Sequence, residues 1–346
     1  MNRPTFVAAV KAAVVVATGV ALAGTGITVS AAAQPTGAAS SARGRIVVSV
    51  EERSGDKMRL ALVTMRAGGS HRFRLTHPAW GYQDMPGVWS PDGRRIAFQR
   101  RDPEGYPNIM TVNADGTRLT QLTHCSIATD PCLEQTPVWM PDGKTLVFEH
   151  CCVATSAGFL DGIYSIRADG THLKRVTLNP DIFWGDGVPA VSPDGRWIAF
   201  SRFRGADDDP ENKSVSAMFL VRPDGSRLHQ ITSYDLMVDE KDWSPDGRRI
   251  VFTTHAGSND GPFRADVFSV RPDGTGLNAL TTTTPGEDLA FFPNWSPDGR
   301  TILFNYSATG GTCIHLLTMR PDGSRVRQLA DPPACGFWPD WTDKSR

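Results

Sequence analysis

The sequence predicts an all-β fold, namely a six-bladed β-propeller with four antiparallel strands in each blade. Three observations support this prediction. A pentapeptide of the Trp-Ser-Pro-Asp-Gly type recurs at steps of 50 to 52 residues, each copy precedes a short apolar segment, and each of these repeats contains a second Asp-Gly turn. No repeat shows the period of an amphipathic helix. Glycine and proline, 33 and 25 of the 346 residues, suit a chain with many tight turns.

The pentapeptides are predicted to close hairpins between the first and second strands of each blade. Proline presets the turn, aspartate hydrogen-bonds to the backbone nearby, and glycine accepts the left-handed conformation. The copies are Trp89–Gly93, Trp139–Gly143, Val191–Gly195, Trp243–Gly247 and Trp295–Gly299, with a degenerate copy at Trp341–Asp343. The second strands that follow are Ile96–Phe98, Leu146–Phe148, Ile198–Phe200, Ile250–Phe252 and Ile302–Phe304. The second turns are at 114–117, 168–171, 223–226, 272–275 and 321–324.

The first blade is predicted to combine both ends of the domain. Ile46–Val50, Leu60–Met65 and Phe73–Thr76 have the pattern of second, third and fourth strands that lack a first strand. Pro339–Trp341, at the other end of the chain, supplies it. The count then reaches six blades, and the ring closes by pairing the N- and C-terminal strands, which removes two open sheet edges.

Residues 1–33 are predicted to form a secretory signal peptide. Arg3 and Lys11 precede an uncharged apolar stretch, and Ala31–Ala33 offers the small residues that a signal peptidase recognises. An uncleaved membrane anchor is the alternative, because the stretch has almost the length of a membrane span. After cleavage we expect no membrane span, a flexible leader at 34–44 and a single propeller domain at 45–346.

The net charge of the chain and its predicted export exclude some classes of function. With 36 basic and 37 acidic residues the chain is nearly neutral, which excludes a typical nucleic-acid binder. We expect a monomer that is secreted or extracytoplasmic, in the periplasm or cell envelope, where disulfides persist.

The repeat resembles a known family. Over residues 45–342, the repeat is similar to the TolB-type (WD40-like) β-propeller repeat. The similarity lies in the order of four motifs: Trp-Ser-Pro-Asp-Gly, then Ile-Ala-Phe, then Arg-Pro-Asp-Gly-Ser/Thr, and a final Leu-Thr. The family is named after a periplasmic protein that also has an N-terminal α/β domain and binds a peptidoglycan-associated lipoprotein. The resemblance implies an exported propeller scaffold. Residues 34–44 are too few for that extra domain, so we expect it to be absent.

One face of the propeller is predicted to carry long, varied loops, while the opposite face carries the uniform Asp-Gly turns. Long loops on a rigid scaffold are where binding usually occurs. All six cysteines fall on the long-loop face. We expect Cys313 to pair with Cys335, because their loops are neighbours. Three pairings are open for Cys125, Cys132, Cys151 and Cys152, and cross-loop pairs are favoured over the strained ring that Cys151 and Cys152 would form.

Acidic and aromatic residues are predicted to gather where the first strands begin, at the mouth of the central channel. They are Trp80, Tyr82, Asp84, Glu134, Phe183, Trp184, Asp186, Asp239, Glu240, Asp288, Phe291, Phe337 and Trp338. Carboxylates there can hold a cation or a basic side chain, and aromatic faces can stack on a sugar or anchor a peptide. In the alternative interpretation, the aromatics only fill the mouth and the acids are solvated.

Signatures for catalysis are missing from the sequence, which has no Gly-x-Ser-x-Gly, His-Glu-x-x-His or phosphate-binding glycine motif. We therefore expect a non-enzymatic scaffold that binds a protein or a cell-envelope glycan through the long-loop face. The alternative is a metal-assisted lyase or hydrolase of carbohydrates at the channel mouth, with carboxylate ligands and histidines drawn from His124, His150, His255 and His315. No cofactor is expected apart from calcium, for which the acidic run Asp207, Asp208, Asp209 and Glu211 offers oxygen ligands without a known loop spacing.

Overall fold

The computed structural model describes residues 44–125, 132–152, 161–178, 184–204, 215–255, 264–284, 286, 288–308, 314–329 and 336–342. Regular structure within these residues is β-strand except for the short 3₁₀ helix η2 (Tyr234–Leu236). The all-β prediction is therefore confirmed. None of the described residues belongs to a helix with the length and hydrophobicity that crossing a bilayer requires. The predicted signal peptide, 1–33, lies outside the described residues.

Four sheets have four antiparallel strands each in the described part of the chain. Their strands are β8 (Cys132–Trp139), β9 (Thr145–Cys152), β10 (Gly162–Arg167) and β11 (Lys174–Arg175); β12 (Trp184–Val191), β13 (Ile198–Arg204), β14 (Val215–Val221) and β15 (His229–Gln230); β16 (Val238–Trp243), β17 (Ile250–Thr254), β18 (Asp266–Val270) and β19 (Asn278–Ala279); β20 (Asp288–Trp295), β21 (Ile302–Ala308), β22 (His315–Met319) and β23 (Arg327–Gln328). This is the predicted four-strand repeat.

An eight-stranded sheet contains the other strands, in two parts. One part holds β24 (Gly336–Thr342), β1 (Arg45–Ser54), β2 (Lys57–Arg66) and β3 (Phe73–Arg74), and the other holds β4 (Gln83–Trp89), β5 (Arg95–Arg101), β6 (Pro107–Asn113) and β7 (Thr120–Gln121). A single parallel pair, Leu60 with Gln83, joins the parts. The last strand β24 pairs antiparallel with β1, from Arg45 opposite Thr342 to Val50 opposite Gly336. No sheet in the described residues closes on itself.

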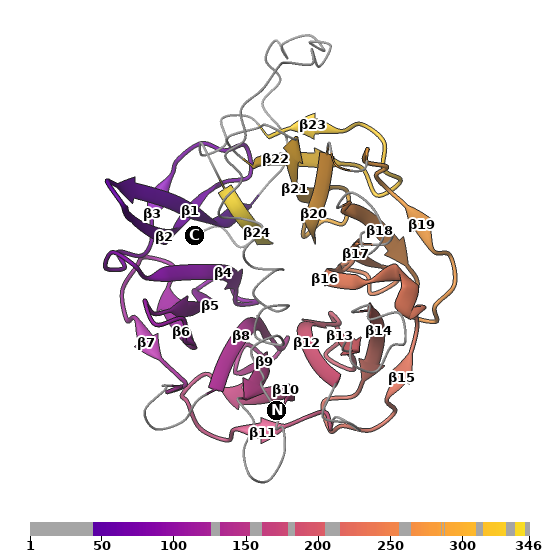
Figure 1. The fold of residues 1–346 in the computed structure, drawn as a ribbon, viewed down its shortest axis with the longest axis horizontal. Coiled ribbons are helices and arrows are strands. Elements are labelled where there is room, and N and C mark those ends of the chain that lie inside the picture. The colour runs from indigo at the N-terminus through magenta and orange to yellow at the C-terminus, as the bar shows by residue number, and fades with distance from the viewer. Residues whose placement is uncertain are drawn as a thin grey trace, which may run out of the picture.

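The sheets stand around a common centre (Figure 1). We call β4, β8, β12, β16, β20 and β24 the inner strands, since they surround the centre, whereas the two-residue strands β3, β7, β11, β15, β19 and β23 lie at the perimeter. Such short outer strands offer few unpaired backbone groups to other chains.

The core lies between neighbouring sheets and repeats with them. One phenylalanine of each Ile-Ala-Phe-type segment is buried there: Phe98, Phe148, Phe200, Phe252 and Phe304. The inner-strand tryptophans are buried beside them, and arginines of the preceding sheet cover two of these rings. The Arg45 guanidinium lies 4.4 Å from the Trp89 ring centre, and that of Arg95 lies 4.6 Å from the Trp139 ring centre. The motif tryptophan therefore serves as packing between sheets.

The turn motif is held by side-chain hydrogen bonds. Ser192 Oγ donates to Asp194 Oδ1 (2.7 Å), which also accepts from Arg196 N (3.0 Å), and Ser192 Oγ accepts from Trp197 N (2.9 Å). The Ser192 bond holds the pKa of Asp194 below its usual value. The same bonds recur at Asp92, Asp246 and Asp298, so the Ser-Pro-Asp-Gly spacing is explained by the turn alone.

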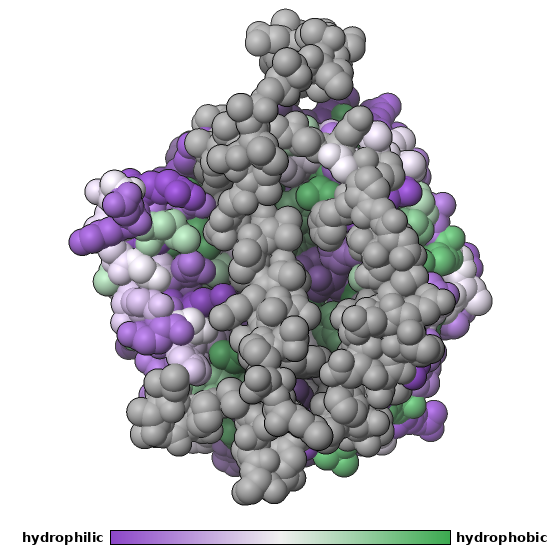
Figure 2. All heavy atoms as spheres, in the orientation of Figure 1, coloured by the Kyte–Doolittle hydropathy of each residue, from purple (hydrophilic) through white to green (hydrophobic). Residues whose placement is uncertain are grey.

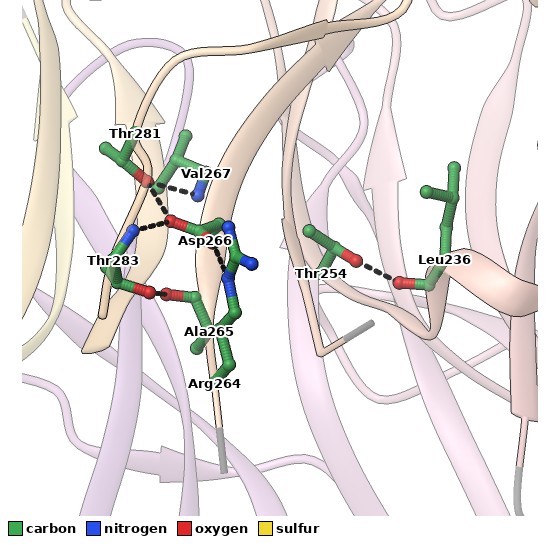
Figure 3. A network of polar contacts seen from close by, with 8 residues as sticks. All are labelled: Leu236, Thr254, Arg264, Ala265, Asp266, Val267, Thr281 and Thr283. Atoms are coloured by element: carbon green, nitrogen blue, oxygen red, sulfur yellow. Dashed lines mark hydrogen bonds and ion pairs between the residues drawn. The ribbon is translucent and has the colours of Figure 1, made fainter. Parts of the chain in front are cut away.

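The final Leu-Thr of the repeat fastens the outer strand to the third strand. Thr281 Oγ1 accepts from Val267 N (2.9 Å) and donates to Asp266 Oδ1 (2.9 Å), which also accepts from Thr283 N (2.7 Å) (Figure 3). Arg264 Nε contacts the other Asp266 oxygen at 2.5 Å. Equivalent hydroxyls at Thr76, Thr123, Thr177 and Thr232 accept from the third strand in the same way.

Candidate functional site at the inner-strand bulges

Every inner strand carries a β-bulge, where its register with the next strand shifts. A bulge re-aims side chains and is frequent next to functional sites. We call the residue three places before the final motif tryptophan, or before Val191, the bulge residue. The six bulge residues are Pro86, Thr136, Val188, Glu240, Phe292 and Trp338.

Four bulge residues have a left-handed backbone: Thr136, Val188, Phe292 and Trp338, with φ of 47° to 53°. The preceding sheet holds each one through its N–H. Thr136 N donates to Gln99 Oε1 (2.9 Å), Val188 N to Glu149 Oε2 (3.2 Å), Phe292 N to Thr253 Oγ1 (3.1 Å) and Trp338 N to Asn305 Oδ1 (3.2 Å). Backbone strain of this kind persists where the surroundings fix it, and it clusters at binding sites. The bulges are thus preorganised.

Aromatic side chains meet at two adjacent bulges, those of β20 and β24. The ring centres of Phe291 and Phe292 are 5.0 Å apart, and those of Phe292 and Trp338 are 5.3 Å apart. All three side chains are half-buried. The predicted residues Phe291 and Trp338 are thus brought together, with Phe292 between them.

Charged side chains occupy the bulge of β16. Asp239 Oδ2 lies 3.4 Å from His255 Nε2, and burial together with the Asp239 charge raises the pKa of Glu240 to about 8. Lys241 Nζ donates to Val188 O (2.7 Å). Burial lowers the pKa of Lys241 to about 8 and raises that of Glu149 to about 7. Charged groups of two sheets, Glu149 of one and Asp239, Glu240, Lys241 and His255 of the other, therefore meet around the backbone of Val188 between them.

Three predicted rim acids instead lie inside their own sheets. Asp84 accepts from Arg100 at 2.6 and 2.8 Å, Asp186 from Arg202 at 2.6 and 2.8 Å, and Glu134 Oε1 lies 2.8 Å from His150 Nδ1. Each acid is directly opposite its base in the strand register. All three acids are buried, so they do not converge at an open rim as we expected.

The remaining predicted residues are dispersed or outside the described part. The Arg59 guanidinium lies 4.1 Å from the Trp80 ring centre, the half-buried Tyr82 follows shortly after, and Tyr306 donates to Asp288 Oδ1 (2.8 Å). Only the backbones of Trp184 and Phe337 are described, in β12 and β24. The residues that lie outside the description are Phe183, Asp207, Asp208, Asp209, Glu211, Cys313 and Cys335.

The cysteine pairing differs from our expectation. The disulfide joins Cys125 to Cys132, whose Cα atoms are 5.1 Å apart, so neither is available for a cross-loop pair with Cys151 or Cys152. The two cysteines bound the same short loop, and their Cα separation suits a bridge. Cys125 is also positioned by Asn108, whose side chain contacts both its N–H and its carbonyl.

Sequence reasoning missed Glu149, Lys241 and Phe292. The sequence does contain a signal for Glu149, because each Ile-Ala-Phe-type segment is followed directly by a polar residue. These residues are Gln99, Glu149, Ser201, Thr253 and Asn305. These residues reach the next sheet, and Glu149 is the only ionisable one. Lys241 stands where β8, β12, β20 and β24 have proline, which hides its role from a motif search.

The face in Figure 2 is mixed in polarity near its centre. Where described atoms are visible there, hydrophilic and hydrophobic surface lie side by side.

Comparison with known proteins gives one family. A family model described as the TolB beta propeller domain matches residues 125–343. An uncharacterised protein of Agrobacterium fabrum is 33% identical over 208 residues, which are 60% of this chain and 61% of that protein. The Tol-Pal system protein TolB of Francisella tularensis subsp. tularensis is 28% identical over 181 residues, which are 52% of this chain and 37% of that protein.

A solved structure shares the fold. The crystal structure of TolB from Acinetobacter baumannii superposes with a TM-score of 0.64 at 19% identity, covering 86% of this chain and 66% of that one. At that identity the likeness concerns the fold alone. The chain matches between about one third and three fifths of the length of the two curated relatives.

Proposed function

Because the chain belongs to the TolB β-propeller family, we propose that it is a non-enzymatic, extracytoplasmic binding scaffold. We further propose that it has six blades and that β24 closes the ring by pairing with β1. Family membership supports an envelope role, and the sequence pattern of a signal peptide supports export. Its partners and its monomeric state remain part of the proposal.

One observation supports the proposed binding role: the preorganised bulges of β20 and β24 present aromatic groups, and the neighbouring bulge of β16 presents acidic groups. Phe292 and Trp338 offer half-buried rings, and Glu240 with Asp239 offers carboxylates on β16, the strand beside β20. Aromatic anchors held on a rigid frame supply much of the affinity in protein interfaces.

The partner that suits this surface is a protein segment with an apolar anchor and a basic side chain. Apolar groups pack against the Phe292 and Trp338 rings, and a Lys or Arg side chain is attracted by Asp239 and Glu240. A cell-envelope glycan without cationic groups can stack on the rings and donate hydroxyl hydrogen bonds to the carboxylates, but it gains no charge attraction from them. A protein partner is therefore favoured.

The experiment compares two faces of the scaffold. Purified chain is used as bait for envelope extract and, separately, for purified cell-wall glycan. We expect an extract protein to be retained, and we expect Trp338→Ala with Glu240→Gln to reduce its affinity about tenfold or more. The matched control, Arg94→Ala with Arg248→Ala on the Asp-Gly turns, should leave affinity unchanged.

Three outcomes would contradict the proposal. Retention of glycan alone would replace the protein partner, and equal losses for both variant pairs would remove the bulges from the binding role. Turnover of an envelope carbohydrate by the purified chain would favour the enzymatic alternative. Far-UV circular dichroism and the melting temperature of each variant check that its fold is intact.

A further inference from the structure

The bulge of β16 differs chemically from every other inner-strand bulge. Its two residues between the register pairs Val238–Thr254 and Lys241–Phe252 are Asp239 and Glu240. In the other inner strands, the residues that lie between the two flanking register pairs are a single proline or a neutral residue followed by proline. They are Pro86, Thr136–Pro137, Val188–Pro189, Phe292–Pro293 and Trp338–Pro339. In a regular strand, consecutive side chains point to opposite faces, but a bulge lets two consecutive side chains approach the same neighbour.

That neighbour is His255, which directly follows the paired strand β17. The His255 Nε2 and Asp239 Oδ2 atoms are 3.4 Å apart, and one donor atom from each of Asp239, Glu240 and His255 lies within 4.8 Å of the other two. Two ligands of a tetrahedral ion, each about 2.0–2.1 Å from it, are separated by about 3.4 Å. The three side chains thus offer one nitrogen and two oxygen ligands from one place in the fold.

The local charge balance favours a cation at this place. Lys241 directs its ammonium group to the Val188 carbonyl of the preceding sheet, at 2.7 Å. Asp239 and Glu240 are consecutive carboxyl groups, and one donor atom of each lies within 4.8 Å of the other and of His255. A cation bound between them would offset the mutual repulsion of the two carboxylates.

We propose that Asp239, Glu240 and His255 bind a divalent first-row transition-metal ion. One imidazole nitrogen with two carboxylate oxygens suits Zn²⁺, Co²⁺ or Mn²⁺, whereas Ca²⁺ and Mg²⁺ prefer oxygen-only sets. Three protein ligands leave at least one position for water or a partner group. The site uses residues of the surface proposed above, yet it requires no partner, so either proposal can fail while the other holds.

The test uses the purified full chain, stripped of metal by a chelator and dialysed. Isothermal titration with Zn²⁺ should show one site per chain, and Co²⁺ should give the visible absorption of a low-symmetry, four- or five-coordinate ion. His255→Gln and Asp239→Asn should each weaken Zn²⁺ binding by about 100-fold or more, since changes even around metal ligands cost about 10–100-fold. The exposed His172→Gln is the matched control and should bind like the parent chain.

Several results would overturn the assignment. They are the absence of a stoichiometric site in the parent chain, a His255→Gln affinity equal to that of the His172→Gln control, or the cobalt spectrum of a six-coordinate aqueous ion. Near-UV circular dichroism shows whether each variant is folded. Glu240→Gln supplies an independent readout, because it keeps the shape of the side chain and removes one ligand charge.

Discussion

The inner strands β4, β8 and β12 place their acids differently from β16, β20 and β24. In the first group the acid lies five residues before the final Trp or Val, and it pairs with a base of the same sheet, as Asp84 does with Arg100. In the second group an acid or amide stands directly before the tryptophan: Asp242, Asn294 and Asp340. These side chains reach neighbouring sheets. Asp242 accepts from Trp295 N (2.7 Å), and Asp340 accepts from Trp89 N (2.6 Å) and from Asn294 (3.1 Å).

The difference separates two uses of buried charge. Pairs of the first group lie within single sheets: Asp84 and Asp186 each accept two hydrogen bonds from the arginine opposite, and Glu134 contacts His150. Acids of the second group connect sheets by accepting hydrogen bonds from backbone N–H groups, as Asp242 does from Trp295 and Asp340 does from Trp89. The same side of the ring carries the aromatic bulges and the charged bulge of β16. The binding that we propose therefore uses the side of the ring where Val238, Ala290 and Gly336 stand at the position of the buried acids of the first group.

Removing β24 should have the largest effect. A chain ending at residue 335 loses the partner of β1, the Asp340 links and the buried Trp341 in the cluster that contains Ile46 and Leu303. The edge of β1 that pairs with β24 becomes exposed. We expect loss of cooperative unfolding, or aggregation on expression, measured by chemical denaturation and size-exclusion chromatography.

The control for this truncation is removal of residues 343–346, which leaves all of β24 in place. An unchanged melting temperature for the chain ending at 335 would contradict both the role of β24 and the proposed closure of the ring.

Breaking a first-group pair should have the next largest effect. Asp186→Ala removes the carboxylate opposite Arg202, whose side chain is only 5% exposed, and we expect a loss of about 3–5 kcal/mol in the free energy of unfolding. Asp84→Ala should cost less, because the Arg100 side chain is 19% exposed and water can solvate it. Urea denaturation measures both. Equal losses of unfolding free energy in Asp186→Ala and Asp84→Ala would show that burial of the opposing arginine does not determine how much each substitution destabilises the protein.

The second-group acid Asp340 should make the free energy of unfolding depend on pH. Burial raises the pKa of Asp340 to about 6, so its protonated form is favoured by folding. Its contribution is full below the unfolded value near 3.8 and is lost as pH rises through about 6, an effect on the order of 3 kcal/mol. Asp340→Asn keeps an acceptor for Trp89 N and should remove this part of the pH dependence between pH 4 and 7. A stability difference from the parent that is constant across this range would contradict the prediction.

The contrast between groups also explains what could be predicted from sequence. The fold was predictable because its signals are local: the Ser-x-Asp-Gly hydrogen bonds close each turn within six residues, as from Ser192 to Trp197. The site was less predictable because it depends on register. Asp84 and Asp239 look alike in sequence, yet one lies opposite an arginine and the other lies in a bulge beside His255. The disulfide was mispredicted because sequence does not reveal that Cys125 and Cys132 approach across their own loop.

The smallest predicted effect concerns Asp288 of β20, which accepts a hydrogen bond from the neutral side chain of Tyr306. Burial and the hydrogen bond to Asp288 raise the pKa of Tyr306 to about 12, because the carboxylate accepts from the phenol and repels its ionised form. Asp288→Asn removes that charge and should move the titration of Tyr306 toward the ordinary value near 10. Ultraviolet difference titration of tyrosinate, with Tyr306→Phe to assign the signal, measures the shift. No movement would mean that burial alone controls this tyrosine, and the Asp288 carboxylate would then be solvated and accessible to a basic partner group.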